Sequence, residues 1–245
     1  MNRVVIIGGG AAGMMAAIAA ADAGAQVTIF EKNEKLGKKL FITGKGRCNV
    51  TNAGDMENLF SNVMTNEKFL YSAFYTYDNQ AIMDFLEKAG CPLKVERGDR
   101  VFPVSDHSSD VIAAFIRELK KRNVRIEINT GVRELLVAQN ATQETGTIEK
   151  EVQQQIKGVL LDDGKKVMAD TVIVATGGIS YASTGSTGDG YRFARESGHK
   201  VTECKPSLVP FNVKESWCGE AMGVSLKNVS LRLVCGKKEI YSGFG

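Results

Sequence analysis

The sequence has no large excess of charge of either sign, and it has little proline. Lysine and arginine number 31 and aspartate and glutamate 28, which leaves a net charge of +3 with no long basic run. This balance argues against a dedicated nucleic-acid binder, so no nucleic-acid partner is predicted. Proline numbers only 4, while glycine reaches 26. Such an excess of glycine suggests a backbone that works close to a ligand rather than a flexible linker.

Long hydrophobic runs and paired cysteines are missing as well. The apolar stretches are too short and too interrupted by glycine to span a bilayer, and the N-terminus lacks a signal-peptide pattern, so no membrane partner is predicted. The five cysteines form no CxxC pair, which argues against a zinc knuckle or a disulfide framework, and no metal site is predicted. A reducing cytoplasm is the simplest location for such a chain.

The composition that remains is that of a globular protein. Hydrophobic residues make up 43% of the 245 residues and charged residues 24%, which is enough for a sizeable core. A chain of this length predicts one large domain, or one domain and part of another. The segment Pro206–Pro210 (PSLVP) interrupts the preceding pattern, so we expect a first domain over 1–205 and the beginning of a smaller, β-rich second domain over 206–245.

The first thirty residues have the pattern of one strand, helix, strand unit. Val4–Ile7 is a continuous apolar run, typical of a strand buried on both faces of a parallel sheet. Ala11–Ala23 is rich in alanine and is followed by Gly24, which predicts a helix and its C-terminal end. Val27–Phe30 is a second apolar run, and it ends at the acidic residue Glu31.

Between the first strand and the helix stands the motif GxGxxG, formed by Gly8, Gly10 and Gly13. In a dinucleotide-binding fold the first glycine makes a tight turn, the second admits the pyrophosphate and the third lets helix and strand pack closely. Amides at the helix start, including those of Ala11 and Ala12, would face the phosphates, and Glu31 would accept hydrogen bonds from ribose hydroxyls. The sequence therefore predicts dinucleotide binding; the alternative is a glycine-rich turn without a ligand.

The remainder of the first domain predicts an α/β fold with an antiparallel meander. We expect Lys32–Asn52 to be an ordered functional loop, Asp189 to cap a short helix over Tyr191–Ser197, and Gln139–Gln155 to be a polar tip. The other expected helices are Asn79–Ala89 and Ser108–Arg122. The expected strands lie at Val95, Val101–Val104 and Val124–Ile128, in a meander over Arg133–Ala138, Ile156–Leu161 and Lys166–Ala169, and in a buried strand over Thr171–Ala175.

A meander followed by Ala175-Thr176-Gly177 resembles the two-dinucleotide-binding-domain flavoproteins, whose Rossmann-like domain binds FAD. The chain has no second GxGxxG with a downstream acid. If NAD(P)H is the reductant, it is therefore expected to reach the flavin only transiently.

A more specific resemblance rests on the loop 43–52 (TGKGRCNVTN), with GKKL at 37–40, GDRVFPVS at 98–105 and TGSTGDGY at 184–191. These motifs are similar to those of the bacterial NAD(P)/FAD-dependent oxidoreductases related to BaiN and YhiN, which include aminoacetone oxidase. Relative to that family the chain looks short at its C-terminus, and we expect the ring side of the flavin site to be incomplete.

The resemblance implies a set of FAD-binding residues in addition to the glycine motif. Arg47 is expected to contact an anion, with a solvated loop cation as the alternative, and Cys48 is expected to be a packing residue near the cofactor rather than a reactive thiol. His107 and His199 have patterns typical of surface or capping positions, and no catalytic residue is assigned. The implied cofactor-binding residues are Glu31, Lys32, Lys38, Lys39, Gly46, Arg47, Cys48, Asn49, Val132, Thr176, Gly177 and Gly178.

The function implied is that of an FAD-dependent oxidoreductase. Hydride would pass between NAD(P)H or a reduced substrate and a small organic acceptor or dioxygen by way of the flavin. The alternative is an FAD-binding module without turnover of its own. The sequence assigns neither the substrate, beyond a small molecule, nor the oligomeric state.

Overall fold

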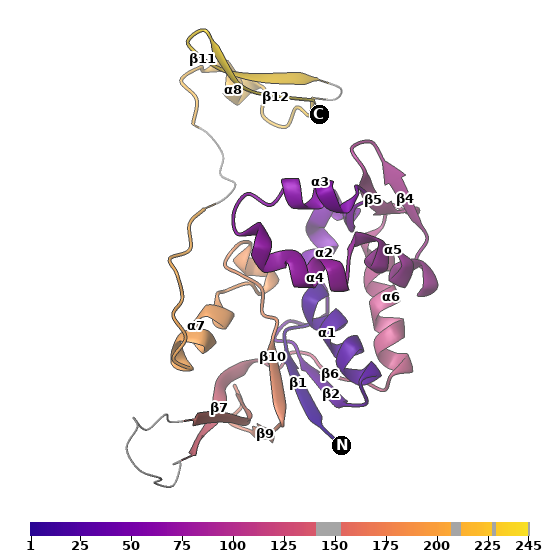
Figure 1. Ribbon diagram of the computed structural model, residues 1–245, viewed down its shortest axis with the longest axis vertical. Coiled ribbons are helices and arrows are strands. Elements are labelled where there is room, and N and C mark those ends of the chain that lie inside the picture. Colours follow the sequence, from indigo (N-terminus) through magenta and orange to yellow (C-terminus); the bar gives the residue numbers. More distant parts are fainter. Residues whose placement is uncertain (141–152, 207–211, 227–228, 245) are drawn as a thin grey trace. The chain divides into compact units, whose positions relative to one another are not determined.

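The computed structural model describes residues 1–140, 153–206, 212–226 and 229–244 (Figure 1). The chain divides into two compact units, Met1–Val201 and Thr202–Gly245, each of which is described by itself. The expected boundary at residues 205 and 206 lies near this division and stays a prediction. Most of the expected polar tip and most of the segment Pro206–Pro210 lie outside the described residues.

The first unit is built on a parallel sheet whose strands lie in the order β10-β1-β2-β6. Its strands are β1 (Arg3–Ile7), β2 (Gln26–Phe30), β6 (Arg125–Glu127) and β10 (Thr171–Val174). The expectation of a fully buried last strand is wrong, because β10 is at the edge of this sheet and Val174 is 40% exposed. An apolar run does not reveal whether a strand is central or at an edge.

The two faces of the sheet are covered by different layers. Side chains alternate along a strand, so Val4 and Ile6 of β1 face one layer while Val5 and Ile7 face the other. In Figure 1, helices α1 and α6 lie on one side of the sheet and β7 lies on the other. The helical layer comprises α1 (Ala11–Asp22), α5 (Asn79–Lys88) and α6 (Ser108–Lys121). The core on this side includes Met14, Leu86 and Leu119.

The other layer is the expected antiparallel meander, with the strand order β7-β8-β9. Its strands are β7 (Val132–Asn140), β8 (Gln153–Leu161) and β9 (Lys166–Met168). Val159 and Phe193, the latter from helix α7 (Asp189–Glu196), pack in a second core under the sheet. The register of β7 with β8 shifts between Val132 and Glu134, so β7 carries a bulge at its N-terminal end.

Shorter elements complete the first unit, including a segment over 53–78 for which sequence patterns give no assignment. A small antiparallel sheet has the order β3-β5-β4. The remaining elements are α2 (Lys38–Ile42), η1 (Thr43–Gly46), β3 (Thr51–Asn52), α3 (Met56–Ser61), η2 (Glu67–Leu70), α4 (Tyr71–Thr76), β4 (Leu93–Glu96), β5 (Arg100–Pro103) and η3 (Ala182–Thr184).

The second unit contains a β-hairpin, and the expected start of a β-rich second domain stays a prediction. Its elements are α8 (Trp217–Glu220), β11 (Ser230–Cys235) and β12 (Lys238–Phe244), and the two strands pair antiparallel. In the described parts of the chain, no helix is both long and apolar enough to cross a membrane.

Candidate functional site

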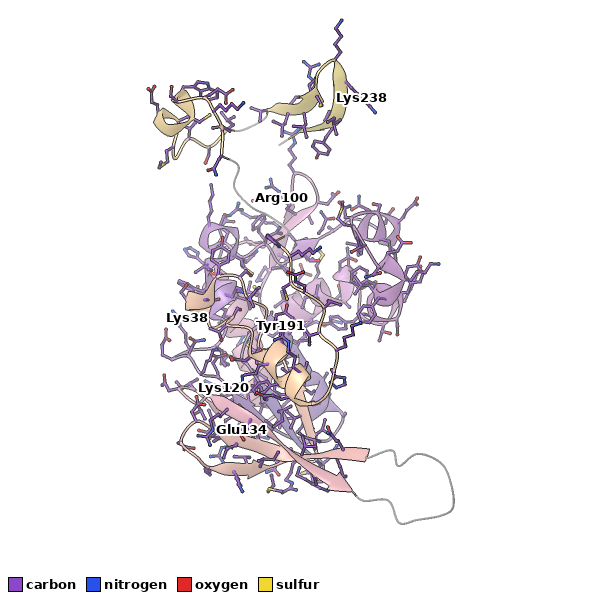
Figure 2. The ribbon with its side chains drawn as sticks, turned by 90° about the vertical axis from the view of Figure 1, so that its left-hand side faces the viewer. Lys38, Arg100, Lys120, Glu134, Tyr191 and Lys238 are labelled. Atoms are coloured by element: carbon purple, nitrogen blue, oxygen red, sulfur yellow. The ribbon has the colours of Figure 1, made fainter. Side chains whose placement is uncertain are left out.

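A cavity of about 830 Å³ lies in the first unit at the carboxyl ends of β1, β2 and β10. This is the edge at which open parallel α/β sheets bind their ligands. The cavity extends from the first turn of α1 to the start of β7 and the first turn of α7. In Figure 2, Tyr191 marks α7 and Glu134 marks β7, the two elements that border its far end.

The three glycines of the motif are needed for three different reasons. Gly8 has a φ of +105°, and a Cβ there would lie 2.5 Å from the Ala175 carbonyl oxygen of the neighbouring strand. A Cβ on Gly13 would lie 1.9 Å from the Gly8 carbonyl oxygen, so the helix could not approach the turn. A Cβ on Gly10, by contrast, would meet no protein atom within 4 Å. Gly10 therefore leaves room for a ligand rather than for another part of the protein.

The start of α1 gives this space a positive character. Ala11 and Ala12 line the cavity, and the first hydrogen bond of the helix runs from the Met14 amide to the Gly10 carbonyl oxygen. The preceding amides have no partner within the helix, and the helix dipole favours negative charge at this end. The helix has no acidic residue in its first turn to satisfy that preference. An anionic group of a ligand would do so.

Glu31 stands at the end of β2 and is only 7% exposed. One carboxylate oxygen accepts a hydrogen bond from the Gly9 amide at 2.7 Å. The other accepts from the Asn33 amide at 2.8 Å and from the Asn33 side chain at 2.7 Å. Since a carboxylate offers about four acceptor positions, room for a ribose hydroxyl remains. Glu31 thus also shapes the glycine turn, a role that sequence reasoning missed.

Thr176 is the one described residue whose buried side-chain oxygen lacks a hydrogen-bond partner, and it lines the cavity. A Cβ on Gly190 would lie 2.9 Å from this hydroxyl, so a larger residue there would press against it. Gly177 also lines the cavity, with a φ of +74°. A buried hydroxyl without a partner costs free energy unless a ligand supplies one. Together with the open space at Gly10, this orphaned oxygen fits a cavity built to hold a polar ligand.

Three lysines, Lys32, Lys38 and Lys39, line the cavity, and each donates hydrogen bonds to neighbouring side chains. The Lys32 ammonium donates to Thr187 at 2.6 Å and to Asp189 at 2.7 Å. The Lys39 ammonium donates to the Ser186 hydroxyl at 2.7 Å. The Lys38 ammonium lies 3.2 Å from a carboxylate oxygen of Glu34, in a more exposed pair. Lys32 and Lys39 therefore hold the segment 180–189 beside the cavity, whereas Lys38 does not contribute to this contact.

The expected capping role of Asp189 is wrong. Gly188 is the residue at the N-cap of α7, and Asp189 is the first helical residue. Burial opposes ionisation of Asp189, but hydrogen bonds from Lys32 and Thr187 hold the pKa of its carboxyl below the usual range. Its carboxylate therefore serves the cavity wall rather than the helix amides.

Within the loop 43–52, Thr43 lines the cavity but Arg47 does not. The guanidinium donates to Asp106 at 2.8 Å, also pairs with Glu96, and stacks 4.0 Å from the centre of the Phe102 ring. The guanidinium is 34% exposed and is paired with two protein carboxylates, and its expected contact with an anion of the cofactor stays a prediction. Sequence reasoning missed these partners because Glu96 at the end of β4 and Asp106 after β5 are distant from Arg47 in the chain.

The remaining expected residues divide by position. Cys48 is fully buried, burial raises the pKa of its thiol, and it packs in the helical core as expected for a packing residue. His107 and His199 are both exposed, and the His107 side chain makes no capping bond. The expected residues that line the cavity are Gly8, Gly10, Ala11, Ala12, Glu31, Lys32, Lys38, Lys39, Val132, Thr176 and Gly177. Those that do not line it are Gly13, Gly46, Arg47, Cys48, Asn49 and Gly178.

Several cavity residues carry no signal in the sequence. They come from the end of β2, the turns of the meander, the segment before α7 and α7 itself, and none was assigned a role from the sequence. These are Asn33, Thr130, Gly131, Asp162, Ser186 and Arg192. The described residues contain no group of three or more His, Cys, Asp or Glu side chains that could hold a metal ion.

The ion pairs of Arg47 allow a prediction about stability. Hydrogen bonds from Lys94 and Arg47 hold the pKa of Asp106 below its usual range, and Arg47 does the same for Glu96. Carboxyls with a lowered pKa in the folded state stabilise it above their unfolded pKa, and this contribution is lost as the pH falls through the lowered values. Arg47→Met should therefore unfold at lower urea concentration at pH 7, and the difference from the unmodified chain should shrink toward about pH 3.

Arg100→Met serves as the control. Arg100 lies on β5, which pairs with the strand of Glu96, and its side chain donates to the Arg97 carbonyl oxygen rather than to a carboxylate. Urea unfolding followed by circular dichroism at both pH values measures the effect. An equal loss of stability at both pH values would show that these pairs do not set the stability of the loop.

The parallel sheet, the glycine turn, the acidic residue after β2 and the cavity above them define the class of Rossmann-type nucleotide-binding folds. The chain belongs to the family described as HI0933-like protein Rossmann domain, which matches residues 2–241. This agrees with the resemblance drawn from the loop 43–52 and its companion motifs.

Curated relatives are longer than this chain. A 3-dehydro-bile acid delta(4,6)-reductase of Clostridium scindens is 37% identical over 91% of this chain and 51% of its own length. A ribosomal RNA dihydrouridine synthase of Haemophilus influenzae is 29% identical over 95% of this chain and 55% of its own length. The chain thus spans about half the length of these relatives.

Solved structures support the fold. A 3-ketosteroid delta1-dehydrogenase from Sterolibacterium denitrificans superposes with a TM-score of 0.56 at 14% identity, covering 80% of this chain and 55% of that chain. The Sdh1 complex of Mycobacterium smegmatis gives a TM-score of 0.55 at 22% identity, covering 80% of this chain and 39% of that chain. At such identities the likeness concerns the fold alone.

Proposed function

We propose that this chain binds FAD in the cavity and forms the nucleotide-binding part of a flavin-dependent oxidoreductase. The observation that carries the proposal is the open space at Gly10, beside the free amides of α1, in a cavity of about 830 Å³. That volume is within the range of cofactor sites. The name of the bile acid reductase relative supports a reductive reaction, and the family match supports the same cofactor class.

Each part of the nucleotide has a counterpart among the residues of the cavity. The amides at the start of α1 would bind the pyrophosphate, and Glu31 would accept a ribose hydroxyl. Thr176 would donate its orphaned hydroxyl to the bound cofactor. When bound, FAD would supply hydride transfer, while the residues of this chain bind and orient it. No catalytic residue is assigned.

We further propose that the acceptor is a small organic molecule and that NAD(P)H is a transient reductant. The relative with the higher identity is named for a bile acid, which favours this substrate class over nucleic acid. The relatives named for ribosomal RNA at 29% identity nevertheless make RNA a second candidate, against the expectation of no nucleic-acid partner. The near-neutral net charge of +3 favours the small molecule.

The test is a titration of the purified, flavin-free chain with FAD, followed by anaerobic addition of NADH or NADPH. We expect stoichiometric binding, seen as quenching of flavin fluorescence, and bleaching of the flavin absorbance when the reductant is added. Binding without reduction would support the alternative, an FAD-binding module without turnover. No binding of FAD at all would overturn the proposal.

A further inference from the structure

Asp162 is an acidic cavity residue whose position no motif explains. It follows β8 and stands opposite Gly131, to whose carbonyl oxygen its amide donates at 3.0 Å. A Cβ on Gly131 would lie 1.9 Å from a carboxylate oxygen of Asp162. Gly131 has no positive φ, so its backbone conformation does not require glycine. The exposed carboxylate of Asp162 thus lies where a side chain at position 131 would stand, so a larger residue there would have to displace it.

The carboxylate of Asp162 differs from its neighbours in having no partner. In the parts of the chain that the structure describes, no amide, hydroxyl or cation donates to it. Asp163, the next residue, accepts from the Lys165 amide at 2.9 Å. The nearby cavity cation Arg192 donates to the Arg133 carbonyl oxygen at 2.8 Å and pairs with Glu196. Asp162 thus presents a free acceptor at the wall of the cavity.

This acceptor lies beyond the ribose site. The Thr130 amide donates to the Glu31 carbonyl oxygen at 2.9 Å, so the strand end that carries Glu31 is adjacent to the segment 130–133. A nucleoside whose ribose contacts Glu31 must place its base on that side, away from the glycine turn and the pyrophosphate. Thr130, Gly131, Val132 and Asp162 all line the cavity there.

We propose that Asp162 selects adenine by accepting a hydrogen bond from the 6-amino group of the base. A carboxylate accepts and does not donate when it is ionised, so it suits an amino group and disfavours a base that presents a carbonyl oxygen or nothing at that position. The regular pairing of β7 with β8 is interrupted beside this region, by the bulge between Val132 and Glu134. This inference rests on the proposed nucleotide binding and names the residue that determines base specificity.

The test compares ADP with purine riboside 5′-diphosphate, which lacks the 6-amino group, by isothermal titration calorimetry on the whole chain. The unmodified chain should prefer ADP about tenfold, the value of one hydrogen bond to a charged acceptor. Asp162→Ala should bring the two affinities together by weakening ADP alone. Asp162→Asn, which keeps the size of the side chain, should reduce the preference in the same direction. Asp163→Ala is the control, and it should keep the preference.

The outcomes separate this inference from the proposed function. Binding of ADP and FAD with an unchanged preference in both Asp162 variants would overturn the role of Asp162 and leave FAD binding standing. An equal weakening of both diphosphates would mean that Asp162 supports the fold of the turn, which also contradicts the inference. Absence of binding by either diphosphate and by FAD to the unmodified chain would overturn both proposals.

Discussion

Gly10→Val should abolish FAD binding and leave the folded protein as stable as before. Gly10 has a φ of −78° and a ψ of −173°, a conformation open to any residue, and a Cβ there would touch no protein atom within 4 Å. The valine side chain would therefore fill only the space that we assign to the pyrophosphate. Methyl groups in this space would keep the phosphates from reaching the amides at the start of α1.

Gly13→Ala is the matched contrast for this experiment. Its Cβ would lie 1.9 Å from the Gly8 carbonyl oxygen, so the variant should lose stability as well as binding. Flavin fluorescence quenching and thermal unfolding, measured on both variants, distinguish a lost ligand site from a lost fold. If the Gly10→Val protein purifies with bound flavin, the assignment of the phosphate site is wrong.

Glu31→Ala should weaken FAD binding by about ten- to hundredfold, since a hydrogen bond to a charged acceptor contributes about 1.5 to 3 kcal/mol. The sequence alone predicts that the fold is unaffected. The structure changes that expectation, because the carboxylate also accepts from the buried Gly9 amide at 2.7 Å. We therefore expect a loss of stability of about 1 to 3 kcal/mol beside the loss of affinity.

Glu31→Gln separates the two effects, because the amide keeps the shape of the side chain and one acceptor oxygen. Glu34→Ala is the control, because it removes a nearby carboxylate whose ion pair with Lys38 is on the surface. It should change neither the affinity nor the stability by much. Affinity is measured by titration with FAD and stability by urea unfolding. An affinity for FAD in Glu31→Ala equal to that of the unmodified chain would place the adenosine ribose elsewhere.

Much of the fold could be predicted because it is encoded in local patterns. The apolar runs at Val4–Ile7 and Val27–Phe30 predicted β1 and β2. The alanine-rich segment Ala11–Ala23, followed by Gly24, predicted α1. The meander expected over Arg133–Ala138, Ile156–Leu161 and Lys166–Ala169 predicted the pairing of β7, β8 and β9. Hydrophobic periodicity and turn chemistry act over a few residues, so one sequence suffices to read them.

The candidate site could be predicted only in part, for the same reason. Gly10 and Glu31 are marked by a motif whose spacing reflects one strand, helix, strand unit. Asp162 and Arg192 are not marked, because they reach the cavity only when the meander and α7 fold against the parallel sheet. The partners of Arg47 could not be predicted because Glu96 and Asp106 are distant from it in sequence.

The sequence by itself determined the class of fold, the phosphate turn and the acidic residue that follows β2, since each depends on residues close together in the chain. The tertiary structure decided which charged side chains are free to meet a ligand. Lys32 and Arg47 are both cations near the predicted site, yet both are bound by carboxylates from remote elements, whereas Asp162 is left without a partner. The pairing of charges depends on distances of a few ångströms between segments that only the packed fold brings together.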